Sequence, residues 1–125
     1  MKPLDEPLTI RYSKPPRNPS GGGGLVSTVS DYLRFGQMLL NQGEQDGTRL
    51  LGRKTVEWML QNHLPAGITA NNDPASGFGL GGSVLLYPGL SHLPYSVGKF
   101  GWSGAANTRW WIHPAEDLQC LLLAQ

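Results

Sequence analysis

The chain has 125 residues, of which 39% are hydrophobic and only 15% are charged, and its formal net charge at pH 7 is +1. This length fits one domain, on the usual scale of about 100–200 residues per domain. The small net charge excludes the basic surface of a typical nucleic-acid-binding protein, and no stretch approaches the roughly 20 apolar residues of a membrane span. The single cysteine, Cys120, excludes an internal disulfide and a thiolate zinc site.

Residues 1–24 are rich in proline and glycine, and we expect them to form a surface arm. Within the arm, Leu8–Tyr12 alternates apolar with polar residues, which would allow a short strand. The run Gly21–Gly24 favours a hinge over a phosphate site, because no P-loop or dinucleotide-binding signature accompanies it. No secretory signal is recognisable in the given sequence, which leaves the compartment open between cytoplasm and periplasm. Residues 25–125 are assigned to one partial domain.

Two helices are expected next. The first covers 28–42, because Thr28 and Asp31 form a variant capping box and apolar residues then recur with helical spacing up to Gly43. The turn that follows has Asp46-Gly47 at its tip. The second helix covers 53–62, and a polar loop follows over 65–77.

The last third of the chain reads as antiparallel strands. Two helices followed by a sheet of about four strands indicate an α+β fold. We expect the last strand to be central and buried on both faces, with Cys120 as an unreactive buried thiol, because nearly all of its residues are apolar. The expected strands are Phe78–Tyr87, Ser96–Ser103, Thr108–Ile112 and Leu118–Ala124.

Two short motifs resemble those of acyl-transfer enzymes. Ser96–Lys99 reads S-x-x-K, but Val97-Gly98 indicates a strand, in which positions i and i+3 point to opposite faces, so we interpret it as a coincidence. Gly101–Ala105 approaches the nucleophile elbow G-x-S-x-G, which requires a helix after the serine. A turn and another strand are expected there instead, so a free-standing hydrolase that uses Ser103 is kept only as an alternative.

The three histidines, His63, His92 and His113, lack the spacing of metal ligands, and no carboxylate cluster flanks them. We therefore expect no metal and no cofactor. His63, at a helix end, and His113, at a turn, are interpreted as structural.

Three segments taken together resemble the serine β-lactamase family, which includes class C-type β-lactamases, D-alanyl-D-alanine carboxypeptidases and related esterases and lipases. The segments are residues 21–63, GFGLGGSVLLYPG and GKFGWSGAANTRWWIHPAEDLQCLLLAQ. The resemblance implies the C-terminal part of the β-lactamase/transpeptidase-like fold and an acyl-enzyme mechanism. In that family a Ser-x-x-Lys on a helix supplies the nucleophile, a Tyr-x-Asn assists, and a Lys/His-Thr/Ser-Gly strand lines the opposite wall. The resemblance places Trp102, Ser103 and Gly104 at this third motif as substrate-binding residues, with the Ala105 N–H as an oxyanion donor.

The sequence departs from the pattern of this family in two ways, and both affect the functional prediction. Trp102 stands where penicillin-active members carry Lys or His, which resembles the esterase branch and favours an uncharged acyl group. No tyrosine has Asn two residues later, and Ser96–Lys99 lies too close to the third motif to be the first. The resemblance therefore implies a C-terminal fragment whose nucleophile-bearing N-terminal half is missing.

We predict a partial serine hydrolase whose parent is a carboxylesterase or lipase. Its partners would be a small ester or β-lactam-like substrate and the missing N-terminal half of the fold. Two alternatives remain: a noncatalytic remnant or binding module, and a β-lactamase or D-alanyl-D-alanine carboxypeptidase. We also expect residues 102–105 to end a strand that faces an open groove, because small residues there would let a substrate approach closely.

Overall fold

The computed structural model describes residues 17–18, 20–22 and 25–124. Most of the arm predicted over 1–24, including the possible strand Leu8–Tyr12, therefore lies outside the described residues, and the boundary at residue 25 stays a prediction. The described part folds as α1 (Val29–Leu40), β1 (Glu44–Gln45), β2 (Thr48–Arg49), α2 (Arg53–Met59), η1 (Ala70–Asn72), β3 (Ser76–Phe78), β4 (Ser83–Leu85), η2 (Pro88–Leu90), β5 (Phe100–Ser103), β6 (Thr108–His113), η3 (Pro114–Glu116) and β7 (Leu118–Leu123).

Both predicted helices are present. Thr28 caps α1, since its hydroxyl oxygen accepts a hydrogen bond from the Asp31 N–H at 3.1 Å. After α1 the chain turns at Asp46 and Gly47, which both have positive φ, and β1 pairs with β2 as a short hairpin. The second helix, α2, ends at Met59, three residues earlier than expected. None of the described helices is long and apolar enough to cross a membrane.

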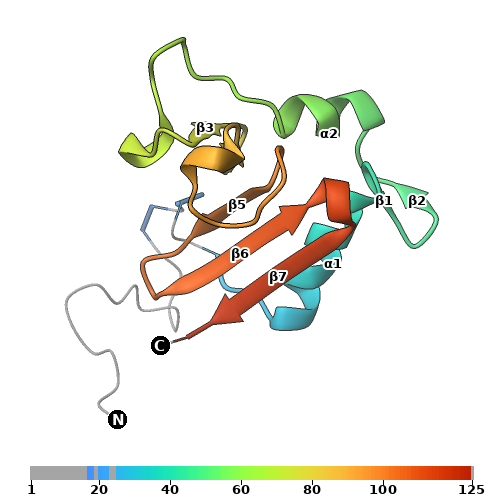
Figure 1. The fold of residues 1–125 in the computed structure, drawn as a ribbon. Coiled ribbons are helices and arrows are strands. Elements are labelled where there is room, and N and C mark those ends of the chain that lie inside the picture. Colours follow the sequence, from blue (N-terminus) through green and yellow to red (C-terminus); the bar gives the residue numbers. More distant parts are fainter. Residues whose placement is uncertain (1–16, 19, 23–24, 125) are drawn as a thin grey trace.

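Five antiparallel strands form the main sheet, and they lie in the order of the sequence, β3-β4-β5-β6-β7. Figure 1 shows α1 running behind β6 and β7, while α2 and the β1–β2 hairpin lie at one end of the sheet. The α+β prediction of two helices followed by an antiparallel sheet is thus confirmed.

The core fills the space between α1, α2 and one face of the sheet. Leu39 of α1, Val56 of α2 and Ile112 of β6 are each at most 2% exposed. The Trp110 indole packs against Phe100 and against two aromatic rings of α1, Tyr32 at 5.3 Å and Phe35 at 5.7 Å between centroids. Because side chains alternate along β6, Arg109 and Trp111 belong to the other face of the sheet.

The single strand predicted over Phe78–Tyr87 is wrong. The chain reverses there, because the Gly79 N–H donates to the Gly82 carbonyl and Gly81 adopts φ +99°. Two short strands, β3 and β4, form in its place, which gives the sheet one strand more than expected.

The strand predicted over Ser96–Ser103 begins only at Phe100. Residues 96–99 form a turn in which Gly98 adopts φ +87°, a conformation that glycine takes without steric cost.

The last strand, β7, lies at the edge of the sheet and not at its centre as expected. This edge position follows from the strand order of the sheet. Each strand pairs with the strands before and after it in sequence, so β7 pairs only with β6. Leu118, Leu122 and Leu123 are about half exposed, at 49%, 52% and 51%, and the Cys120 thiol is exposed as well. The apolar composition of β7 was therefore a poor guide to its burial.

Candidate functional site

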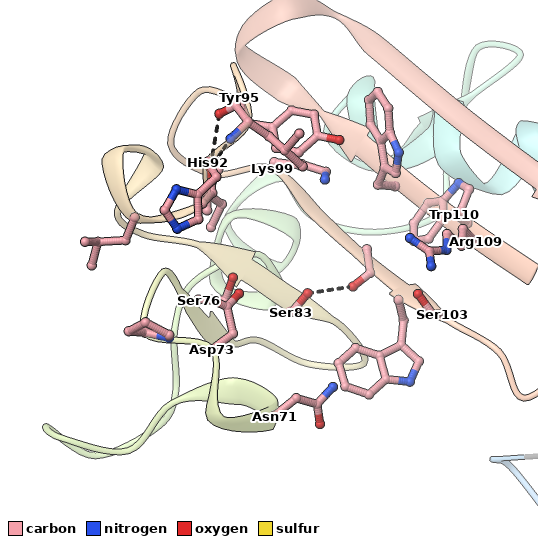
Figure 2. Close-up of a pocket in the computed structure, with 18 residues that line it drawn as sticks. Asn71, Asp73, Ser76, Ser83, His92, Tyr95, Lys99, Ser103, Arg109 and Trp110 are labelled. Carbon is pink, nitrogen blue, oxygen red and sulfur yellow. Dashed lines mark hydrogen bonds between the residues drawn. The ribbon is translucent and has the colours of Figure 1, made fainter. Parts of the chain in front are cut away.

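A pocket of about 660 Å³ opens along β5. Its walls come from η1 and the residues after it, from β3 and β4, from the segment 90–95, and from β5 and β6. Figure 2 shows polar side chains from several of these elements around the opening, among them Ser83, Lys99, Ser103 and Arg109. A volume of this size accommodates a small organic ligand.

Trp102 and Ser103 both line this pocket. β4 pairs with β5 only as far as Ser83 opposite Gly101, so Trp102 and Ser103 extend beyond the end of β4. The Trp102 side chain is 42% exposed, and its ring meets Phe78 edge-on at 5.0 Å. Of the predicted segment 102–105, Trp102 and Ser103 thus face an open pocket.

Gly104 and Ala105 lie in the turn between β5 and β6, and neither lines the pocket. The turn is closed by a hydrogen bond of 2.8 Å from the Gly104 N–H to the Thr108 carbonyl. A Cβ at position 104 would collide with the Thr108 hydroxyl, so a larger residue there would require the Thr108 side chain to move. The exposed Ala105 N–H has no backbone or side-chain acceptor within the described part of the chain, which leaves it available to a ligand oxygen.

The S-x-x-K sequence does not form a nucleophile–base pair. The Ser96 hydroxyl donates to the Glu116 carboxylate at 2.7 Å, while the Lys99 ammonium lies 3.4 Å from the centre of the Tyr95 ring. Residues 96–99 form a turn and not the expected strand, and this turn lies between the Ser96 hydroxyl and the Lys99 ammonium. The motif is not on a helix, so its interpretation as a coincidence is unchanged.

Two of the histidines make the structural contacts expected of them. His113 is 4% exposed, and its Nε2 accepts a 2.9 Å hydrogen bond from the Ser96 N–H. His63 Nε2 lies 2.7 Å from the Trp58 carbonyl oxygen. His92 lines the pocket instead. Within the described residues, no three His, Cys, Asp or Glu side chains gather closely enough to hold a metal ion.

The pocket also contains two cations that the sequence analysis did not assign to a site, Lys99 and Arg109. Arg109 lies directly opposite Ser103 in the β5–β6 register. The sequence contained a signal for this pairing, namely the short turn expected between two strands. Two strands joined by such a turn place the residues on either side of it opposite each other. Lys99 is the last residue of the S-x-x-K sequence, and that pattern gives no indication of a pocket.

Comparison with known proteins identifies the family to which the chain belongs. A family model described as Beta-lactamase matches residues 2–125. Two Mycobacterium tuberculosis proteins, Uncharacterized protein MT1414 of strain CDC 1551 / Oshkosh and Protein Rv1367c of strain ATCC 25618 / H37Rv, are each 39% identical to the chain over 141 aligned residues. Each alignment covers 100% of this chain and 35% of the relative, so the chain spans about a third of the length of these relatives.

Proposed function

Because the chain belongs to the β-lactamase family, we propose that it forms the substrate-binding wall of a serine hydrolase that works through an acyl-enzyme, and that the whole enzyme is a carboxylesterase or lipase. The observation that carries this proposal is the end of β5. There Trp102 and Ser103 leave the pairing with β4 and line an open pocket, and the unengaged Ala105 N–H follows in the next turn.

Each residue has a role that its chemistry permits. In an acyl transfer the carbonyl oxygen of the substrate gains negative charge in the transition state, and backbone N–H groups aimed at it stabilise that charge. The Ala105 N–H would be one such donor. The Trp102 indole offers a large apolar surface and one N–H, which suits an uncharged acyl group. Ser103 would contribute a hydroxyl to the same wall, and Gly104 keeps the turn compact.

The chain alone should be inactive. Its only Ser-x-x-Lys is the turn at Ser96–Lys99, whose serine and lysine engage other groups. An oxyanion donor without a nucleophile has no reaction to accelerate. We expect no turnover of 4-nitrophenyl acetate or of a chromogenic cephalosporin by the isolated chain. Turnover that is lost in Ser103→Ala would instead support the free-standing hydrolase.

The proposed activity is tested in a chimera in which this chain replaces the matching third of Protein Rv1367c. The expected chimera hydrolyses short-chain 4-nitrophenyl esters with a higher kcat/KM than the cephalosporin. In the Trp102→Lys variant the ratio should move toward the carboxylate-bearing cephalosporin, by roughly 10-fold or more if the new charge-assisted hydrogen bond is fully expressed in the transition state. A chimera that prefers the cephalosporin with Trp102 in place contradicts the esterase assignment. A folded chimera that hydrolyses neither compound favours the noncatalytic alternative.

A further inference from the structure

We infer that His113 is a pH-dependent switch, whose protonation releases the Ser96 N–H and changes the conformation of one wall of the pocket. This wall is formed by residues 91–99, called the rim segment below. The inference goes beyond the proposed function, because it concerns a conformational equilibrium and requires neither acyl transfer nor a ligand. The residues of the rim segment that line the pocket are Ser91, His92, Leu93, Tyr95 and Lys99.

Ser96 attaches the rim segment to the corner formed by β6 and η3. Its N–H donates to Nε2 of His113 at 2.9 Å, and its hydroxyl donates to the Glu116 carboxylate at 2.7 Å. In the described part of the chain, no other residue within 94–97 makes a hydrogen bond to a different helix or strand. The hydrogen bonding of this stretch to the rest of the fold therefore depends on His113 and Glu116.

His113 can accept the Ser96 N–H only while its ring is uncharged, because both nitrogens of an imidazolium are donors. The residue is only 4% exposed. Among the described residues, no carboxylate lies within 4.0 Å of the imidazole nitrogens. Protonation therefore removes the acceptor of the Ser96 N–H and places a charge at a buried position without an ion-pair partner.

The protonated ring has an alternative partner on the same residue. Nε2 of His113 also lies 3.2 Å from the Ser96 carbonyl oxygen. Once Nε2 carries a hydrogen, it can donate to this oxygen, whereas the Ser96 N–H has to turn away from it. The two protonation states thus favour different orientations of the Ser96 backbone.

A rotation of the backbone at Ser96 would reach the pocket through two side chains of the rim segment. Tyr95 directly precedes Ser96, and Lys99 follows it by three residues. Figure 2 shows both side chains together at the pocket, where the Lys99 ammonium lies 3.4 Å from the centre of the Tyr95 ring. Because this contact joins the two sides of Ser96, a change in the Ser96 backbone should displace both side chains.

Histidine is the side chain whose unperturbed titration falls between pH 5 and 8. The rim segment, η3 with the residue after it, and β7 surround His113. Among their titratable groups His92 is the second histidine, so its own protonation has to be separated from that of His113 by experiment. These groups are His92, Tyr95, Lys99, Glu116, Asp117 and Cys120.

The test uses the full 125-residue chain and follows backbone amides and imidazole C–H signals by NMR from about pH 8 to about pH 5. Hydrogen exchange of each amide is compared with that of an unstructured peptide at the same pH, which gives a protection factor. We expect the protection factor of Ser96 to fall by about 10-fold or more as His113 becomes protonated, because the amide loses its acceptor. The amide signals of Tyr95 and Lys99 should shift with the same midpoint as the His113 ring.

Two results with the unmodified chain would overturn the inference. One is a His113 ring that becomes protonated while the exchange of Ser96 stays the same. The other is a His113 ring that remains uncharged down to about pH 5, since the switch would then not operate in the range in which histidines titrate.

Variants then assign the effect to one histidine. His113→Gln keeps an acceptor oxygen but has no charge to gain, so the protection of Ser96 should become independent of pH. The matched control is His92→Asn, because His92 belongs to the same segment and has φ +56°, a conformation that asparagine tolerates. This variant should retain the full pH dependence.

A pH-dependent loss of protection that persists in His113→Gln, or that disappears in His92→Asn, would overturn the role given to His113. If His113→Gln does not fold, the titration of the unmodified chain together with His92→Asn still decides the question. Because the measurements require no hydrolysis, their result is independent of the activity test above.

Discussion

Gly101 lies against β6 with no room for a side chain, and its replacement by alanine gives a sharp test of the geometry of the site. A Cβ at this position would collide with the Trp110 carbonyl oxygen and would lie 2.6 Å from both Trp111 Cα and Trp111 Cβ. Ordinary contacts between carbon atoms are about 3.5–4.0 Å. Two of the three atoms belong to the backbone, so no rotation of a side chain can relieve the clash. β5 and β6 would have to move apart.

The expected loss of stability is large. Overpacking in a well-packed interior typically costs about 1–3 kcal/mol, and a clash with backbone should lie at or above the upper end of that range. The strain also falls on the neighbouring pair of Phe100 with Ile112, which contributes to the core. With a urea m-value of about 1–3 kcal/mol/M, a loss of about 3 kcal/mol lowers the unfolding midpoint of Gly101→Ala by roughly 1–3 M.

The matched control is Gly89→Ala. Gly89 lies in η2, and a Cβ there would meet no heavy atom within 4 Å. Its φ is outside the left-handed region, so alanine should change the free energy of unfolding by only about 0.5–1 kcal/mol in either direction. If Gly101→Ala unfolds at the same urea concentration as Gly89→Ala and the wild type, the close approach of β5 and β6 is wrong, and so is the position assigned to Ser103 opposite Arg109.

Three further predictions concern the scaffold. Thr28→Ala removes the hydroxyl that accepts the Asp31 N–H and should lower the free energy of unfolding by about 1 kcal/mol in urea titrations, while no change would mean that α1 does not begin there. Leu39→Ala should cost about 2–5 kcal/mol in the same assay, because the leucine is 1% exposed; a cost below about 1 kcal/mol would contradict the packing of α1 on the sheet. The hydrogen bond from Lys54 is the main cause that lowers the pKa of Glu57 below its usual value. A lowered folded-state pKa stabilises the protein above the unfolded-state pKa, and this contribution is lost as the pH falls through the folded-state pKa. The urea midpoint of the wild type should therefore exceed that of Glu57→Gln near neutral pH and converge with it in acid, and a pH-independent difference would rule out this ion pair.

The sequence predicted the elements whose signals are local. Thr28 and Asp31 identified the start of α1, and Asp46-Gly47 identified the hairpin turn, because capping and positive φ depend on a few neighbouring residues. The end of a strand at Ser103, followed by a turn, was also predictable from the run of small residues.

The features that the sequence did not predict depend on tertiary placement. The apolar residues of β7 suggested burial on both faces, but burial is decided by the strand's position in the sheet, and β7 lies at its edge. Residues 78–87 were predicted as one continuous strand, although the chain in fact reverses at Gly81. Lys99 and Arg109 line the same pocket although they come from the turn before β5 and from β6, and no local sequence pattern indicates this arrangement.

The order of the sheet has a consequence for how the chain folds as it is synthesised. Pairing of each strand with its sequence neighbour keeps loops short, so the sheet can grow stepwise at low entropic cost. The packing of α1 is different, since Leu39 shares the core with Ile112, and Gly36 lies against the Gln119 side chain. At about 5–20 residues per second, a ribosome completes α1 roughly 4–15 seconds before the strands that cover it. During that interval the apolar stripe of α1 lacks the strands that cover it, and of the described elements only the β1–β2 hairpin and α2 are available to pack against it.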